Sequence, residues 1–256
     1  LGNQPYEKHH QDIFFGRQKA TSQLKKLINQ ADQNHAPGIL IMGSAKVGKT
    51  SILQAAILPF IEQPKKPFKY LQHQPLYLSL DAINLQHLDT IKSALKTNQS
   101  VTSRGHPGST DQRPVLVIDQ LERCLLGDTD DIELLLQFLL SLCLEKKFFL
   151  VLICNHEHYA ELMSIDAFHE LKSQLINHDI RPLTDDELDQ IITLPVAAAG
   201  LGFEYDTERF ESLSAVIRRD ALELRRALPT ISQAMKDLCI HHNESHQLTF
   251  TAYESM

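Results

Sequence analysis

Eight consecutive residues near the N-terminus have the types and spacing needed to bind the phosphates of a nucleotide. They match the pattern G-x-x-x-x-G-K-[ST] in full and read Gly43, Ser44, Ala45, Lys46, Val47, Gly48, Lys49 and Thr50. In such a loop backbone N–H groups surround the phosphates, the lysine contacts the β- and γ-phosphates, and the threonine hydroxyl holds Mg²⁺. The pattern predicts a site for nucleotide and Mg²⁺, with Lys49 and Thr50 as its main side chains and Ser51 following them.

The segments on both sides of this loop have the order that phosphate binding requires. Residues 38–42 form a short apolar run after Pro37, which predicts one buried strand. Residues 51–60 are apolar on nearly every side and predict a buried helix, whose N-terminus carries a partial positive charge. The alternative is a glycine–lysine turn that matches the pattern by chance, and such a turn would not require the strand before it or the helix after it.

A second cluster of polar residues follows another apolar run, at residues 114–118. This run ends on Asp119, Gln120 and Glu122. Ligands of doubly wound sheets bind at the carboxyl ends of the strands, so Asp119 is predicted to meet Mg²⁺ through water. The alternative is an ordinary aspartate at a strand-to-turn junction.

The residues after Asp119 also bear on hydrolysis. In many P-loop ATPases the next residue is a carboxylate that takes a proton from water, whereas Gln120 carries an amide, which cannot act as a base. Glutamines that orient water in unassisted GTPases give rates of about 10⁻⁴ to 10⁻² s⁻¹. Glu122 is the nearby carboxylate that can substitute as the base: if the strand continues, it shares a face with Gln120, so it can support Gln120 or contact the water itself. Asn155, after the apolar run 148–153, is either a γ-phosphate sensor or a turn residue.

The composition fits a globular protein and excludes several classes. Of 256 residues, 43% are hydrophobic and 22% are charged. The net charge of −7 argues against a broadly basic surface, so no nucleic-acid partner is expected for this fragment. No apolar run approaches the roughly 18 residues of a membrane span, and residues 1–10 lack a signal-peptide core, so no membrane partner is expected. Widely spaced cysteines in apolar stretches favour a reducing, cytoplasmic location.

The remaining pattern predicts strands first and helices later. Strands are expected at residues 76–80, closing on Asp81, and within 174–183, and residues 98–113 predict an exposed loop. A capping box at Thr184 to Glu187 predicts a helix that contains Pro195, which should kink it. Further helices are expected at about 207–217 and 230–240. A second capping box at residues 251–254 would start a helix that the chain does not complete, which indicates a piece of a longer protein.

With these segments in place the chain resembles the novel STAND class one group of the STAND NTPases, which are signal-transduction ATPases with numerous domains. The resemblance rests on motifs over most of the chain. They are Pro5-Tyr6, Phe14-Phe-Gly-Arg17, Gly43 to Thr50 with Ile57-Leu-Pro59, Val115 to Glu122, Arg181 to Leu188 through Pro195, Ala199 to Glu204, Leu228-Pro229, and Leu248 to Glu254. Three positions depart from the family pattern: Gln18 replaces a usual Glu, Arg123 replaces a second Glu, and Asn155 stands where Arg is expected.

The resemblance implies an α/β P-loop NTPase of the AAA-like class, with a parallel sheet in the order 5-1-4-3-2 and a helical lid. It implies an N-terminal segment and helix at 1–36, a core at 37–182 and a lid at 183–256. ATP or ADP with Mg²⁺ would be the cofactors, with adenine near Phe15, Gly16 and Arg17 and with Pro195 facing the nucleotide.

As for function, the resemblance implies a slow ATP-hydrolysing switch in a larger signalling or defence protein. Its partners would be other domains of the same longer chain and, on activation, further copies of itself. The alternatives are a DNA-associated AAA-type loader or transposition ATPase, and a nucleotide-binding scaffold without turnover. A small-molecule kinase is favoured least, because the chain shows no arginine-rich lid.

Overall fold

A computed structural model gives the fold of this protein and describes residues 5–63, 68–80, 92–93, 112–223 and 227–256. The chain forms two compact units. We call residues 22–44 and 57–180 the sheet unit, and residues 1–21, 45–56 and 181–256 the lid unit. In the part of the chain that the structure describes, no helix has the length and apolarity to cross a membrane.

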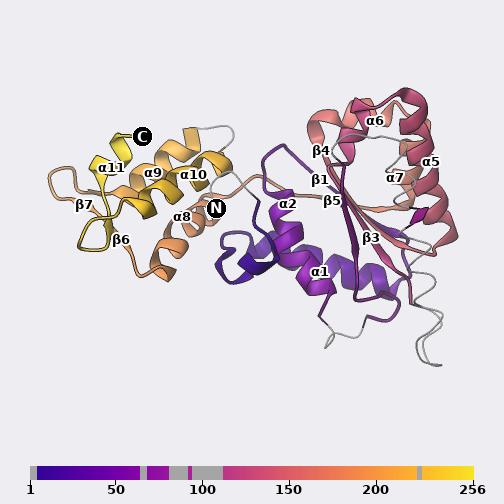
Figure 1. Ribbon diagram of the computed structural model, residues 1–256, viewed down its shortest axis with the longest axis horizontal. Coiled ribbons are helices and arrows are strands. Elements are labelled where there is room, and N and C mark those ends of the chain that lie inside the picture. Colours follow the sequence, from indigo (N-terminus) through magenta and orange to yellow (C-terminus); the bar gives the residue numbers. More distant parts are fainter. Residues whose placement is uncertain (1–4, 64–67, 81–91, 94–111, 224–226) are drawn as a thin grey trace. The chain divides into compact units, whose positions relative to one another are not determined.

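The sheet unit is built on five parallel strands in the order β2-β3-β4-β1-β5, which confirms the predicted order (Figure 1). Their apolar sequences suit strands that are covered on both faces. The strands are β1 (Gly38–Gly43), β2 (Leu76–Ser79), β3 (Val115–Asp119), β4 (Phe149–Asn155) and β5 (Ile176–Asp179). Every neighbouring pair of strands is parallel.

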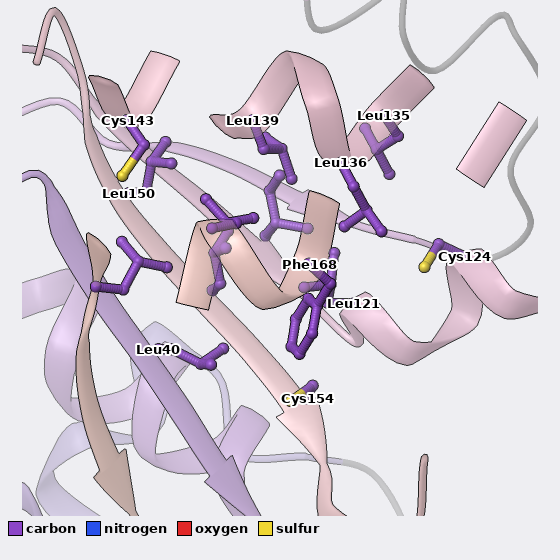
Figure 2. Close-up of a cluster of buried hydrophobic side chains, with 14 of the residues drawn as sticks. Leu40, Leu121, Cys124, Leu135, Leu136, Leu139, Cys143, Leu150, Cys154 and Phe168 are labelled. Atoms are coloured by element: carbon purple, nitrogen blue, oxygen red, sulfur yellow. The ribbon is translucent and has the colours of Figure 1, made fainter. Parts of the chain in front are cut away.

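Helices cover both faces of this sheet. On one side lie α5 (Thr129–Glu145), α6 (Tyr159–Met163) and α7 (Asp166–Gln174), and on the other lies α1 (Gln18–Gln33) (Figure 1). Figure 2 shows the apolar cluster beneath α5 and α7. From the strands it takes alternate side chains, which include Leu40, Leu116, Ile118, Leu150, Leu152 and Cys154. Because side chains alternate along a strand, the residues between these belong to the opposite face.

We call residues 43–50, which are predicted to bind phosphates, the phosphate loop. The helix predicted after this loop is interrupted. It consists of α2 (Lys49–Ile52), a π-helical turn η2 (Leu53–Ile57) and α3 (Leu58–Ile61). Pro59 has no N–H and cannot donate to the Ala55 carbonyl four residues earlier, so the backbone widens at this point. The predicted helix is therefore present over residues 49–61, but a π-helical turn interrupts its α-helical geometry.

Two other predictions in this unit need comment. Arg113, predicted to end an exposed loop, is 5% exposed, and its Nη1 donates to the Ala36 carbonyl at 2.9 Å. Most of that predicted loop, and Asp81, lie outside the described residues.

The chain also contains short 3₁₀ segments. They are η1 (Lys8–Ile13) in the lid unit and η3 (Leu121–Leu126) and η4 (His156–His158) in the sheet unit.

The lid unit contains a small helical core of its own. Its helices are α8 (Asp185–Ala198), α9 (Leu213–Glu223), α10 (Ala227–Ile240) and α11 (Phe250–Glu254). Two short pairs of strands accompany them: β6 (Gly202–Phe203) runs parallel to β9 (Gln247–Leu248), and β7 (Tyr205–Asp206) runs antiparallel to β8 (Glu211–Ser212). The apolar faces of α8, α9 and α10 share one buried cluster.

The helix ends in this unit test the capping predictions. Both hydrogen bonds of the Thr184 to Glu187 capping box are present at the start of α8, and the helix continues through Pro195 to Ala198. The cap of α11 was placed wrongly at Thr251: Thr249 takes that role, and its hydroxyl accepts from the Ala252 N–H at 3.2 Å.

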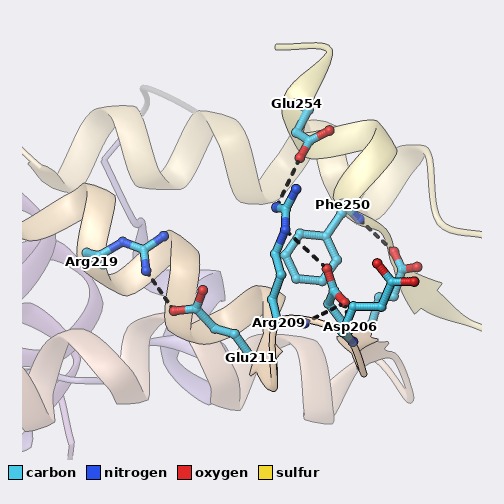
Figure 3. Close-up of polar contacts among 8 residues, drawn as sticks. Asp206, Arg209, Glu211, Arg219, Phe250 and Glu254 are labelled. Carbon is cyan, nitrogen blue, oxygen red and sulfur yellow. Dashed lines mark hydrogen bonds and ion pairs between the residues drawn. The ribbon is translucent and has the colours of Figure 1, made fainter.

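The predicted helix at 207–217 was wrong in its first half, because residues 207–210 form a turn and β8 follows. The Asp206 carboxylate accepts from the N–H groups of Glu208 and Arg209 at 2.8 and 3.0 Å. Figure 3 shows Arg209 between Asp206 and Glu254, and Arg219 on Glu211. An aspartate that binds the N–H groups two and three residues later stabilises a turn in preference to a helix.

Candidate functional site

Three neighbouring strands of the sheet unit end in polar or glycine residues that share one face. Gly43 of β1 pairs with Asn155 of β4, and Ile118, the residue before Asp119 on β3, pairs with Leu152. Leu152 and Ile118 belong to the cluster under α5 and α7, so alternation places Gly43, Asn155 and Asp119 on the opposite face. The start of the phosphate loop, the proposed sensor and the proposed metal ligand therefore stand at adjacent strand ends.

Asp119 is held in place by hydrogen bonds within the sheet unit. Its carboxyl group is buried, with the residue 1% exposed. One oxygen accepts from the Tyr77 hydroxyl at 3.2 Å and the other from the Gln120 N–H at 2.9 Å. The sequence analysis missed Tyr77. It lies on β2 opposite Val117, which shares a face with Asp119, so the register of the two strands would have revealed it.

The chain turns sharply after Asp119. Gln120 has φ of 59° and ψ of 46°, and η3 begins at the next residue. The strand therefore ends at Asp119 and does not continue to Glu122. Gln120 and Glu122 do not share a strand face. A non-glycine residue in this left-handed region is uncommon and concentrates at functional sites.

Glu122 is turned toward β4. It is 7% exposed. Its Oε2 accepts from the backbone N–H of Asn155 at 3.1 Å, and its Oε1 accepts from the Asn155 side-chain Nδ2. Both carboxylate oxygens thus have N–H donors, and the two residues predicted as base and sensor form one hydrogen-bonded pair.

The rest of the phosphate loop belongs to the lid unit. Gly48 has φ of 90°, a conformation that side chains disfavour. A Cβ there would lie 3.4 Å from Leu228, an ordinary contact, so the dihedral angle and not crowding requires glycine. Lys49 is 8% exposed, and the Ser51 hydroxyl accepts from the Tyr6 backbone N–H at 3.2 Å. This last bond ties the N-terminal segment to the helix that follows the loop.

Gly16 and Arg17 contact the lid helix α8. Gly16 has φ of 76°, and a Cβ on it would overlap the Ile191 side chain and lie 2.5 Å from the Glu187 carbonyl oxygen. Arg17 is 3% exposed, and its guanidinium donates to the Val47 and Arg181 carbonyls. This arginine was predicted beside the nucleotide, and the structure shows its two Nη atoms bonded to the protein backbone.

Each unit carries part of the predicted set of site residues. The sheet unit holds Gly43, Ser44, Asp119, Gln120, Glu122 and Asn155. The lid unit holds Phe15, Gly16, Arg17, Pro195 and the remaining loop residues from Ala45 to Ser51. Phe15 and Pro195 are half-buried.

Known proteins give two kinds of match. A family model described as Novel STAND NTPase 1 matches residues 1–256. No curated protein matches the sequence. Among solved structures, the chain is similar to the Aeropyrum pernix ORC2 protein (ADPNP-ADP complexes), with a TM-score of 0.64 and 14% identity over 93% of this chain and 66% of that chain. The Aeropyrum pernix ORC1 protein in complex with DNA matches with a TM-score of 0.63 and 13% identity over 95% and 65% of the two chains.

Domain III of the Thermotoga maritima replication initiation protein DnaA is also similar, with a TM-score of 0.54 and 14% identity over 87% and 84% of the two chains. At such identities the likeness shows the fold alone, that of a P-loop ATPase. The chain spans 40% of a similar Hsp104 chain and 65% of the ORC1 chain.

Proposed function

Because this chain belongs to the Novel STAND NTPase 1 family, we propose that it is the ATP-binding, slowly hydrolysing switch module of a larger signalling or defence protein. One observation carries the proposal: the strand that opens G-x-x-x-x-G-K-[ST] ends beside Asn155 and near Asp119, on the same face of the sheet. Carboxyl ends of parallel strands are where folds of this type bind ligands.

The residues present fit a nucleotide with Mg²⁺. Gly48 has the positive φ of a tight glycine turn, and α2 begins at the next residue, so the loop leads into the N-terminus of a helix, where anions are favoured. Lys49 would contact the β- and γ-phosphates, while Thr50 and Asp119 would hold the metal. The metal, when bound, neutralises charge on the phosphate oxygens. Tyr77 keeps the buried Asp119 carboxylate oriented.

Adenine is assigned to the surroundings of Phe15 and Gly16, with Pro195 facing the nucleotide from α8. The half-buried side chains of Phe15 and Pro195 support this assignment, since purine rings bind mostly apolar surfaces. The Nη atoms of Arg17 are already engaged by backbone carbonyls.

Hydrolysis is proposed to be slow, below about 1 s⁻¹ in this fragment. Gln120 follows Asp119 and cannot take a proton from water, although its amide can orient one. The nearby carboxylate of Glu122 accepts two hydrogen bonds from Asn155. Slow turnover suits a timed switch, which assembles with other copies or domains after it changes state.

Calorimetry with ATP and ADP in the presence of Mg²⁺, combined with a steady-state phosphate-release assay, tests the proposal. The wild-type protein should bind both nucleotides and Lys49→Ala should not, because Lys49 is the loop's side-chain cation for the terminal phosphates. Equal affinities in the two proteins would remove the loop from the site. Binding without any turnover would favour the scaffold alternative.

The DNA-associated loader is the second candidate, since one structural neighbour is the Aeropyrum pernix ORC1 protein in complex with DNA. Fast, DNA-stimulated hydrolysis would favour it. The net charge of −7 weighs against it.

A further inference from the structure

Arg17 is buried in the lid unit and has acceptors on two different segments. Its Nη2 donates to the Val47 carbonyl at 2.6 Å, and its Nη1 donates to the Arg181 carbonyl at 3.1 Å. The Glu187 carboxylate lies 3.6 Å from Nη1 and supplies a counter-charge. Burial lowers the pKa of this guanidinium and Glu187 opposes the shift, but an arginine stays charged in a protein. The bond to Val47 is therefore charge-assisted.

The Val47 carbonyl belongs to the peptide that also carries the Gly48 N–H. This peptide is trans and planar, so its C=O and N–H point in opposite directions. An arginine that fixes the Val47 oxygen on one side consequently fixes the Gly48 N–H on the other. Gly48 itself, with φ of 90°, has no Cβ to restrict that peptide. Without Arg17 the peptide would lose the side-chain hydrogen bond that holds its carbonyl in this orientation.

We infer that Arg17 is a positioning residue, which sets the Gly48 N–H as a phosphate donor and does not contact the nucleotide itself. The inference rests on the proposed nucleotide binding and adds the role of this side chain. Preorganised backbone donors cost no reorganisation when an anion arrives. Because the same guanidinium holds Arg181 and Glu187, the donor is also tied to the first turn of α8.

The Glu187 carboxylate connects Arg17 to the start of α8. Its Oε2 accepts from the Thr184 N–H at 3.1 Å in the capping box and also faces Arg17. Gly16, next to Arg17, can approach the Glu187 carbonyl only because it lacks a Cβ. The arginine is thereby seated against α8 by its neighbour as well as by its own bonds.

The experiment compares nucleotide affinity in Arg17→Lys and Arg17→Ala with wild type, by calorimetry with Mg²⁺ and ATP, ADP or GTP, and with adenosine as a ligand without phosphates. Loss of one charge-assisted hydrogen bond should weaken all three nucleotides by a similar factor, about ten- to hundredfold. Adenosine should bind all variants equally. Arg17→Lys should retain part of the affinity, because an ammonium can reach one carbonyl.

A spectroscopic readout separates positioning from general loss of structure. Selective ¹⁵N-glycine labelling resolves the Gly48 amide among 10 glycines. Its signal should shift or broaden in Arg17→Lys without nucleotide, while glycines in the sheet unit keep their positions. Arg218→Gln is the matched control: it removes an exposed arginine of the lid unit whose guanidinium lies 3.7 Å from the Asp189 carboxylate, so affinity and the Gly48 signal should both stay unchanged.

Other outcomes overturn the inference. A loss for ATP but not ADP would mean that Arg17 contacts the γ-phosphate, and a loss for adenosine would mean a contact to the base. Unchanged affinity with an unchanged Gly48 signal would show no role. If Arg17→Ala fails to fold, Glu187→Gln, which keeps the capping box, should give the same uniform loss to a smaller degree. Failure of wild type itself to bind would instead refute the proposed function.

Discussion

The pair formed by Glu122 and Asn155 gives a quantitative prediction. In Glu122→Gln one of the two carboxylate oxygens becomes an NH₂ group, so one N–H of Asn155 faces another donor. A buried donor without an acceptor costs about 1–3 kcal/mol. In Asn155→Ala the backbone bond at 3.1 Å survives and the side-chain bond is lost, which costs about 1.5–3 kcal/mol because the acceptor is charged. We expect each single variant to lower the free energy of unfolding by these amounts.

The double variant distinguishes a shared interaction from two separate effects. It should be less destabilised than the sum of the single variants, by about 1–2 kcal/mol, since the same hydrogen bond is counted in both. Urea unfolding followed by circular dichroism is suitable, because the chain has no tryptophan to report by fluorescence. Glu170→Gln, on an exposed part of α7, is the matched control and should change stability by less than about 0.5 kcal/mol.

Two results would contradict this reasoning. Additivity of the single variants within about 0.3 kcal/mol would show that the side chains do not interact in solution. Turnover provides the second test: phosphate release should fall below the wild-type rate in Glu122→Gln. An unchanged rate in a destabilised variant would confine Glu122 to a structural role.

Three further predictions concern single side chains. Thr184→Ala should lower the free energy of unfolding in urea by about 1 kcal/mol, because the Thr184 hydroxyl accepts from the Glu187 N–H at 3.3 Å. Thr184→Ser should behave as wild type, and an alanine variant as stable as wild type would show that this cap does not stabilise the protein. Burial, and then the nearby Glu122 carboxylate, raise the pKa of Cys124 to about 12, so a thiol reagent at pH 8 should modify the half-buried Cys239 first and Cys124 only on unfolding; rapid labelling of Cys124 in the folded protein would count against its burial. The N–H groups of Arg209 and then Glu208 lower the pKa of Asp206 from its ordinary value of 3.8. The Asp206 carboxylate therefore stabilises the fold above the unfolded pKa, and this stabilisation is lost as the pH falls through the lower folded pKa. A carboxyl NMR titration of Asp206 with a midpoint at or above 3.8 would disprove the lowered pKa.

The sequence predicted the strands, and the position of the glycine-containing loop between a strand and a helix, because their signals are local. Each strand of the sheet centre is an uninterrupted apolar run, and the phosphate loop is a fixed pattern of residue types between a strand and a helix. The family-based strand order was confirmed as well. The family motifs indicate a known order of strands in the sheet, which the local periodicity of the sequence alone does not determine.

The polar contacts were predicted less well because they depend on how separate segments meet. The partnership of Glu122 with Asn155 follows from the left-handed backbone at Gln120, which turns the chain away from the strand. Nothing in the residue types requires that turn. In the same way, the bonds of Arg17 to the Val47 and Arg181 carbonyls use backbone groups, and backbone groups carry no sequence signature.

The pairing of β6 with β9 has a consequence for the order in which the lid unit can fold. It joins two segments that are far apart in the chain, and the nearby bond from the Phe250 N–H to Glu204 spans 46 residues. Closing such a loop costs conformational entropy before the contact forms, and a high share of distant contacts slows folding. We therefore expect the contacts of residues 247–250 with β6 and Glu204 to form later than the contacts within each helix. During synthesis residues 247–250 must leave the ribosome before β9 can pair with β6 and before the Phe250 N–H can reach Glu204.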